Sequence, residues 1–154
     1  MVQLFGKHYL RSPNTSDIAN LLKVGEDRGF PGMLGSLDCM HWAWKNCPRA
    51  RAEQYSGRSG SPTLIHEAVA SYDLRIWHAY FGLPGSNNDI NVLHSSNLFS
   101  NLTQGIAPPA CYTIPGKEYD TGYYVADGIY PKWSTLVQTI SPPQGPKKQH
   151  FAMM

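Results

Sequence analysis

The sequence predicts an α/β domain in which helices flank a mixed β-sheet. A chain of 154 residues has the length of one domain. Its 14 Gly and 12 Pro divide it into short segments. A strand, a hairpin, a helix and a further strand follow one another, which is typical of a mixed sheet. A hydrophobic fraction of 42% excludes a disordered chain, because enough apolar surface is present to form a core.

Composition also narrows the class of protein. A net charge of +2 is too small to identify a nucleic-acid-binding protein unless the basic residues cluster. Three cysteines, an odd number, and the lack of an apolar leader favour reduced thiols inside the cell. No apolar run approaches the roughly 20 residues of a membrane span, so we expect no contact with a membrane.

The first expected elements are a helix and a buried strand. Residues 16–28 carry apolar side chains at helical spacing, with Ser16 or Asp17 as the cap and Gly29 as the stop. Residues 33–42 form a short apolar run, which predicts a buried strand with Asp38 near its end.

A hairpin and a second helix are expected next. Residues 63–72 and 75–83 are rich in β-forming residues, and the turn between them favours a hairpin. Asn87, Asn88 and Asp89 then predict the cap of a helix, which would end in the break between residues 105 and 109. The side chains expected on the inward face of this helix are Ile90, Leu93, Leu98 and Leu102.

Residues 111–126 are predicted to form a second hairpin. Pro115 and Gly116 supply its turn, and Tyr-rich segments supply its arms. Its last strand, residues 123–126, runs directly into Asp127.

Three carboxylates fall at the ends of predicted elements. Asp38 and Asp127 each close a strand, and Asp89 opens a helix. Because α/β sheets build their sites at such ends, we expect these side chains to lie close together. Carboxylates held together repel one another, and oxygen ligands suit Mg²⁺ or Mn²⁺. A divalent metal site is therefore predicted, although aspartates at strand ends and helix caps are common in all domains.

Several other residues have two possible roles. His41, close behind Asp38 on the same strand, is expected on the same face, where it could bind a phosphate or simply fill the sheet surface. Basic residues after the first acid suit phosphate contacts or a solvated loop equally. These basic residues are Lys45, Arg49, Arg51 and Arg58, and a second group near the C-terminus contains Lys132, Lys147 and Lys148. A zinc site at Cys39, His41 and Cys47 is not favoured, because a fourth ligand at structural spacing is absent.

Three sequence blocks resemble a known family. They are GFPGMLGSLDCMHW (residues 29–42), LPGSNNDINVL (83–93) and YYVADGIYP (123–131), in that order. Together they are similar to the signature blocks of PIF/Harbinger transposases and of the nucleases derived from them, with plant members most similar. The resemblance extends from about residue 4 to residue 152.

This resemblance implies an RNase H-like fold of the DDE type, with a mixed sheet and flanking helices, incomplete at the C-terminus. It divides the chain into a helical lead-in, residues 1–28, and a partial nuclease domain, residues 29–152. In that family acidic residues bind two divalent metal ions for the cleavage and joining of DNA strands.

The family's acids carry over to three positions. Asp38 matches the acid of the first block, Asp89 that of the second and Asp127 that of the third. Strand order favours Asp127 over Asp89 as the second member of the catalytic triad, which leaves Asp89 as an auxiliary ligand. The resemblance thus implies Mg²⁺ or Mn²⁺ as the cofactor.

One departure from the family bears on activity. Relatives carry a final glutamate on a helix a few tens of residues beyond the third block, whereas no Asp or Glu follows Asp127 here. Two hypotheses follow: a metal-dependent nuclease domain that is weak or inactive alone, and a non-catalytic, domesticated remnant that binds DNA or protein. DNA and a separate DNA-binding protein are the expected partners. The nucleus is the expected compartment, with the cytoplasm as the alternative.

Overall fold

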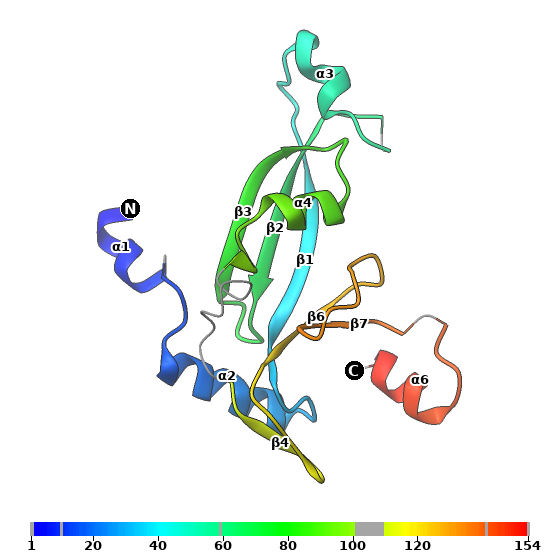
Figure 1. Ribbon diagram of the computed structural model, residues 1–154. Helices are drawn as coiled ribbons and strands as arrows, with labels where there is room; N and C mark the ends of the chain where they lie inside the picture. The colour runs from blue at the N-terminus through cyan, green and yellow to red at the C-terminus, as the bar shows by residue number, and fades with distance from the viewer. Residues whose placement is uncertain (1, 10, 59, 101–109, 141, 154) are drawn as a thin grey trace.

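The computed structural model describes the chain except for residues 1, 10, 59, 101–109, 141 and 154 (Figure 1). Its helices are α1 (Val2–Tyr9), α2 (Thr15–Asp27), α3 (Arg49–Tyr55), α4 (Asp89–Ser95) and α6 (Pro146–Met153). Its strands are β1 (Met33–Ala43), β2 (Thr63–Ala70), β3 (Ile76–Pro84), β4 (Tyr112–Ile114), β5 (Lys117–Tyr119), β6 (Tyr123–Ala126) and β7 (Leu136–Gln138). None of the described helices is both long and apolar enough to cross a membrane.

The main sheet has five strands in the order β3-β2-β1-β6-β7. Strands β1, β2 and β3 are antiparallel neighbours, whereas β6 runs parallel to β1 and β7 parallel to β6. The predicted strands at residues 33–42, 63–72, 75–83 and 123–126 all lie in this sheet. The mixed α/β class is therefore confirmed, while the division of the chain at residue 28 stays a prediction.

Helix α2 begins at Thr15, one residue earlier than predicted, and its cap differs from the predicted one. The cap is Asn14, whose side chain accepts a hydrogen bond from the backbone N–H of Asp17 at 2.9 Å. Asp17 returns a bond, because its carboxylate accepts from the backbone N–H of Asn14 at 2.8 Å. The expectation of Ser16 or Asp17 as the cap was wrong, because Asn14, two residues before Ser16, is the cap and Asp17 bonds back to it from the third helical position.

Helix α4 lies across one face of the sheet and supplies part of the core (Figure 1). Asn88 caps it by accepting from the backbone N–H of Asn91 at 2.9 Å. The helix ends at Ser95, earlier than predicted, and its buried residues are Val92 and Leu93. Leu98 packs against the core from beyond the helix, whereas Leu102 and the break at 105–109 lie outside the described residues.

The two faces of the sheet differ because α4 covers only one of them. The covered face, called the α4 face below, carries Leu37 and Val69, which join Leu93 of α4 in the core. The core consists of Leu37, Val69, Leu93, Phe99, Ala126, Tyr130 and Leu136. The opposite, far face carries alternate residues of β1, and Met40 and Trp42 are 51% and 54% exposed there.

The predicted second hairpin is only partly correct. Strands β4 and β5 form a small sheet of their own around Gly116, whose φ of +87° suits a tight turn. Strand β6 does not pair with them and joins β1 in the main sheet instead. Gly122 allows this departure, since a Cβ atom there would lie 2.7 Å from the side chain of Leu34.

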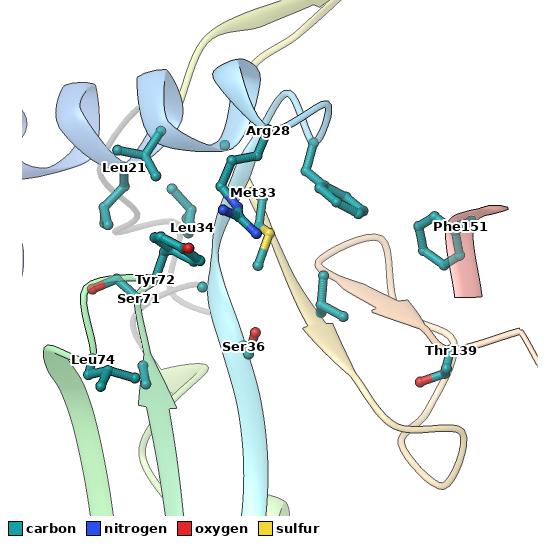
Figure 2. Close-up of a pocket in the computed structure, with 16 residues that line it drawn as sticks. Leu21, Arg28, Met33, Leu34, Ser36, Ser71, Tyr72, Leu74, Thr139 and Phe151 are labelled. Carbon is teal, nitrogen blue, oxygen red and sulfur yellow. The ribbon is translucent and has the colours of Figure 1, made fainter. Parts of the chain in front are cut away.

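An apolar pocket of about 530 Å³ lies on the far face, between α2 and the turn that joins β2 to β3. Figure 2 shows Met33 and Leu34 of β1 among its lining residues, with Phe151 of α6 on the opposite side. The guanidinium of Arg28 lies 3.7 Å from the ring centroid of Tyr72. This pocket is separate from the predicted acidic residues, none of which lines it.

Candidate functional site

Asp38 lies inside β1 rather than near its end. It pairs with Ala68 of β2, and β1 continues for five residues beyond it to Ala43. The predicted position was therefore wrong for β1 itself. The parallel pairing with β6, however, reaches only Ser36, so Asp38 lies two residues beyond the end of that ladder.

Asp127 directly follows the last residue of β6, as predicted. Ser36 pairs with Val125 in the last pair of the parallel ladder, and Asp38 and Asp127 each lie two residues beyond that pair on their own segments. The carboxylate of Asp127 accepts a bond from the backbone N–H of Ile129 at 3.0 Å, which stabilises the turn after β6. The carboxylate of Asp38 accepts from the N–H of Cys39 at 2.8 Å. Both aspartates are exposed.

Asp89 is the first residue of α4, also as predicted, and it is half-buried. Burial raises the pKa of Asp89 above its usual value, and the negative charge of Asp127 is the next largest cause. Asp38 and Glu67 raise it further, while His41 lowers it. Asp38 and Asp127 therefore lie within electrostatic range of Asp89.

The acids do not form a finished metal-binding cluster. Within the described residues, no three Asp, Glu, His or Cys side chains are arranged to hold a metal ion. Asp38 and Asp127 are exposed, and each carboxylate accepts a hydrogen bond from a nearby backbone N–H group. Carboxylate oxygens are the ligands that a hard divalent cation prefers, and a cation would favour the ionised form of Asp89, whose pKa is raised. The three acids therefore fit such a cation chemically.

His41 does not share a face with Asp38, contrary to the prediction. The two residues are three apart, and an odd spacing on a strand places side chains on opposite faces. His41 lies on the α4 side, where its Nδ1 is 3.0 Å from the hydroxyl oxygen of Thr63. It nevertheless influences Asp89, which begins the helix on that side.

The predicted phosphate-binding residues lie away from the acids. Lys45 follows β1, and Arg49 and Arg51 belong to α3, beyond the ends of β1, β2 and β3 (Figure 1). All three are exposed. They form a basic tip of the molecule rather than part of the acidic group.

Glu67 was missed by sequence reasoning. It lies on β2 opposite Cys39 and is fully buried. A signal was available in the segment TLIHEAVA, where alternate residues should share one buried face. Glu67 takes a place in this pattern that Thr63, Ile65 and Val69 otherwise fill.

Cys39 and Tyr130 form a further buried contact near the acids. The Tyr130 hydroxyl donates to the sulfur of Cys39 at 3.3 Å. Burial raises the pKa of Cys39 to about 12, and the charges of Asp89 and Glu67 add to this shift. The thiol is therefore protonated at neutral pH, and the three cysteines form no disulfide.

The sequence matches a known family of proteins over most of its length. Residues 7–154 match the family described as "Plant transposon protein". A Rattus norvegicus protein named "Putative nuclease HARBI1" is 33% identical over 78 residues, which cover 51% of this chain and 22% of that protein. The chain thus matches less than a quarter of the length of this curated relative. No solved structure matches the chain. Since the family match covers nearly all of the sequence, the chain belongs to the plant transposon proteins, a Harbinger-type DDE family related to nucleases.

Proposed function

We propose that this chain is a metal-binding nuclease domain that acts on DNA phosphodiesters and cleaves weakly by itself. The observation that supports the proposal is that Asp38 of β1 and Asp127, directly after β6, lie close enough to Asp89 at the start of α4 for their charges to raise its pKa. The family signature contains these same three positions. The relative's printed name, a nuclease, supports the same chemistry.

The fold we propose for the domain is RNase H-like. Support comes from the sheet order β3-β2-β1-β6-β7, in which three antiparallel strands are followed by two strands parallel to the first. Helix α4 connects the antiparallel part to the parallel part across one face. This topology brings the first and third acid onto neighbouring parallel strands.

The proposed cofactor is Mg²⁺ or Mn²⁺, held by Asp38, Asp89 and Asp127. Carboxylates supply hard oxygen ligands, and a cation would offset the burial and the neighbouring negative charges that raise the pKa of Asp89. When bound, such ions stabilise negative charge during displacement at a phosphodiester. The chain's own contribution is to position the carboxylates and to present them at an accessible edge.

DNA is the proposed substrate and partner. His41, Lys45, Arg49 and Arg51 are the proposed phosphate contacts, of which the last three are exposed cations at the basic tip. A separate DNA-binding protein could deliver the domain to its target. We propose the nucleus of a plant cell as the compartment, because that is where this substrate lies.

Weak cleavage is proposed because the ligand set is small. No Asp or Glu follows Asp127 in the sequence. Catalysis by two metal ions needs enough ligands to hold both ions in register, and a misplacement of ~1 Å can cost about a hundredfold in rate.

Plasmid nicking in the presence of Mn²⁺ tests the proposal. The purified chain is compared with Asp38→Asn and with Glu118→Gln, a control that removes an exposed carboxylate from β5. We expect slow Mn²⁺-dependent nicking that Asp38→Asn abolishes and Glu118→Gln leaves unchanged. Equal nicking by all three proteins would reject a role for Asp38.

A parallel titration with Mn²⁺ separates binding from catalysis. Weak Mn²⁺ binding that is lost in Asp38→Asn or Asp127→Asn, together with little cleavage, supports a metal-binding domain impaired in catalysis. Rapid cleavage by the unmodified chain would show that no further glutamate is needed. Neither binding nor nicking would leave the non-catalytic remnant as the better description.

A further inference from the structure

Glu67 occupies a position where a charged residue is costly. Its side chain is on the α4 face of β2, and its exposed fraction is 0%. Its neighbours along that face, Ile65 and Val69, are buried apolar residues of the core. A carboxyl group in this setting needs hydrogen bonds or a counter-charge for both of its oxygens.

Only one of those oxygens has a hydrogen-bond partner in the described part of the chain. Oε1 lies 3.1 Å from Nε2 of His78 on the neighbouring strand. Oε2 is buried and has no hydrogen-bond partner among the described residues. A second interaction for Oε2 is therefore expected, and its chemistry must suit a carboxylate oxygen.

The surroundings of Glu67 point to the acidic group. Helix α4 packs against β2, and Asp89 begins that helix. Glu67 is one of the charges that raise the pKa of Asp89, and it also acts on Cys39, its partner on β1. The unpartnered carboxylate thus lies on the same side of the sheet as Asp89 and within its electrostatic range.

We propose that Glu67 is a further acid of the metal site, binding a divalent cation together with Asp89 from the α4 side. This inference rests on the proposed metal-binding function and deepens it. Mg²⁺ in proteins often takes only one or two carboxylates and keeps several water molecules, so a pair of acids is a sufficient protein contribution. His78 positions the Glu67 carboxylate by its hydrogen bond, as residues behind metal ligands commonly do.

The cation would therefore lie on the α4 side of the sheet, where Glu67 is the buried acid and Asp89 the half-buried one. Glu67 is fixed by burial and by its hydrogen bond to His78. The buried acid then sets where a cation is held.

Mn²⁺ titration of the full chain tests this role. Glu67→Gln keeps the size of the side chain and can still bond to His78, but it removes the charge. We expect Mn²⁺ affinity to fall by ~10-fold or more, and the Mn²⁺-induced rise in melting temperature to disappear. Glu118→Gln, which removes an exposed carboxylate, should bind Mn²⁺ as the unmodified chain does.

The melting temperature without metal checks that Glu67→Gln folds. If it does not fold, Glu67→Asp takes its place, because it keeps the charge but withdraws the carboxylate by one methylene. Mn²⁺ affinity equal to that of the unmodified chain, in either folded variant, overturns the proposal.

The outcomes distinguish this inference from the function on which it rests. If Asp38→Asn and Asp89→Asn weaken Mn²⁺ binding and Glu67→Gln does not, Glu67 is a buried structural residue and the proposed metal site stands. If the unmodified chain binds no Mn²⁺, both proposals are rejected. Loss of binding in both Glu67→Gln and Asp89→Asn supports the shared site.

Discussion

Asn14 and Asp17 exchange hydrogen bonds across the first turn of α2, and both bonds depend on short polar side chains. We predict that Asn14→Ala lowers the free energy of unfolding by ~1 kcal/mol, because backbone donors at the helix start lose their acceptor. Urea denaturation measures this change. Asn20→Ala, an exposed substitution in the middle of α2, is the control and should be neutral or slightly stabilising. Equal losses in both variants would contradict the cap.

The same residue pair makes stability depend on pH. The hydrogen bond from Arg11, followed by that from the Asn14 backbone, lowers the pKa of Asp17 to about 2. A carboxyl whose pKa is lower in the folded state stabilises the protein above its unfolded value near ~3.9, and this stability is lost as the pH falls toward 2. Urea denaturation from pH 5 to pH 2 should show the unmodified chain converging with Asp17→Asn. A constant difference between the two proteins over that range would reject the prediction.

Single residues of the candidate site differ in how far the sequence reveals them. Asp38, Asp89 and Asp127 were predicted from their blocks, because each stands beside recognisable strand or helix signals. Glu67 was not predicted, since a lone acid in an alternating strand more often marks an exposed position than a buried one. The alternation in TLIHEAVA indicated a shared face, and the packing of α4 against β2 shows that this face, with Glu67 on it, is the covered one.

At the scale of elements, the start of β2 and the residue after β3 lie in close contact with the end of α3. A Cβ atom at Gly85 would lie 1.8 Å from the Thr63 hydroxyl and 2.7 Å from the Tyr55 carbonyl oxygen. We predict that Gly85→Ala lowers the free energy of unfolding by at least ~1–3 kcal/mol, because backbone atoms would have to move apart. Thermal and urea denaturation measure this loss.

Gly128→Ala is the matched control for this prediction. A Cβ atom at Gly128 would meet no heavy atom within 4 Å. Its stability should therefore stay within ~0.5 kcal/mol of the unmodified chain. A loss as large as that of Gly85→Ala would show that glycine flexibility, and not close packing, matters at both positions.

Elements with local signals were predicted well, and elements defined by distant partners were not. The hairpin of β2 and β3 follows from two β-forming segments and the turn between them. Strand β6 was assigned to a hairpin with its neighbour in sequence, yet it pairs with β1, about 90 residues earlier in the chain. Periodicity and turn residues carry no information about such a partner, so the parallel half of the sheet became visible only in three dimensions.

At the scale of the whole molecule, the exposed cations Lys45, Arg49 and Arg51 lie together at one end, in and beside α3. We predict that a triple variant, in which Ala replaces Lys45, Arg49 and Arg51, binds DNA more weakly. Its DNA affinity should also depend less on the salt concentration. Each lost phosphate contact should reduce the slope of log K against log salt concentration by about 0.9, so three contacts reduce it by roughly 2 to 3. Fluorescence anisotropy with duplex DNA at several NaCl concentrations measures the slope.

A control variant that loses the same number of positive charges elsewhere distinguishes the effect of the basic tip from the effect of net charge. Lys7, Lys23 and Lys117 are exposed lysines on α1, α2 and β5, and their replacement with Ala also removes three positive charges. This variant should keep more of the slope than the first. The same slope in both variants would mean that DNA responds to overall charge and not to the basic tip.

The irregular backbone of β3 has a consequence for how the protein behaves at high concentration. In the described part of the chain β3 ends the sheet order, so one side of its backbone offers hydrogen-bonding groups to other molecules. Its pairing with β2 shifts register twice, and Gly82 has a φ of +112°. These irregularities twist the strand and interrupt the straight ladder that a second copy would need for edge-to-edge pairing. These irregularities therefore work against fibril growth from an edge that carries the exposed Ile76 and Phe81.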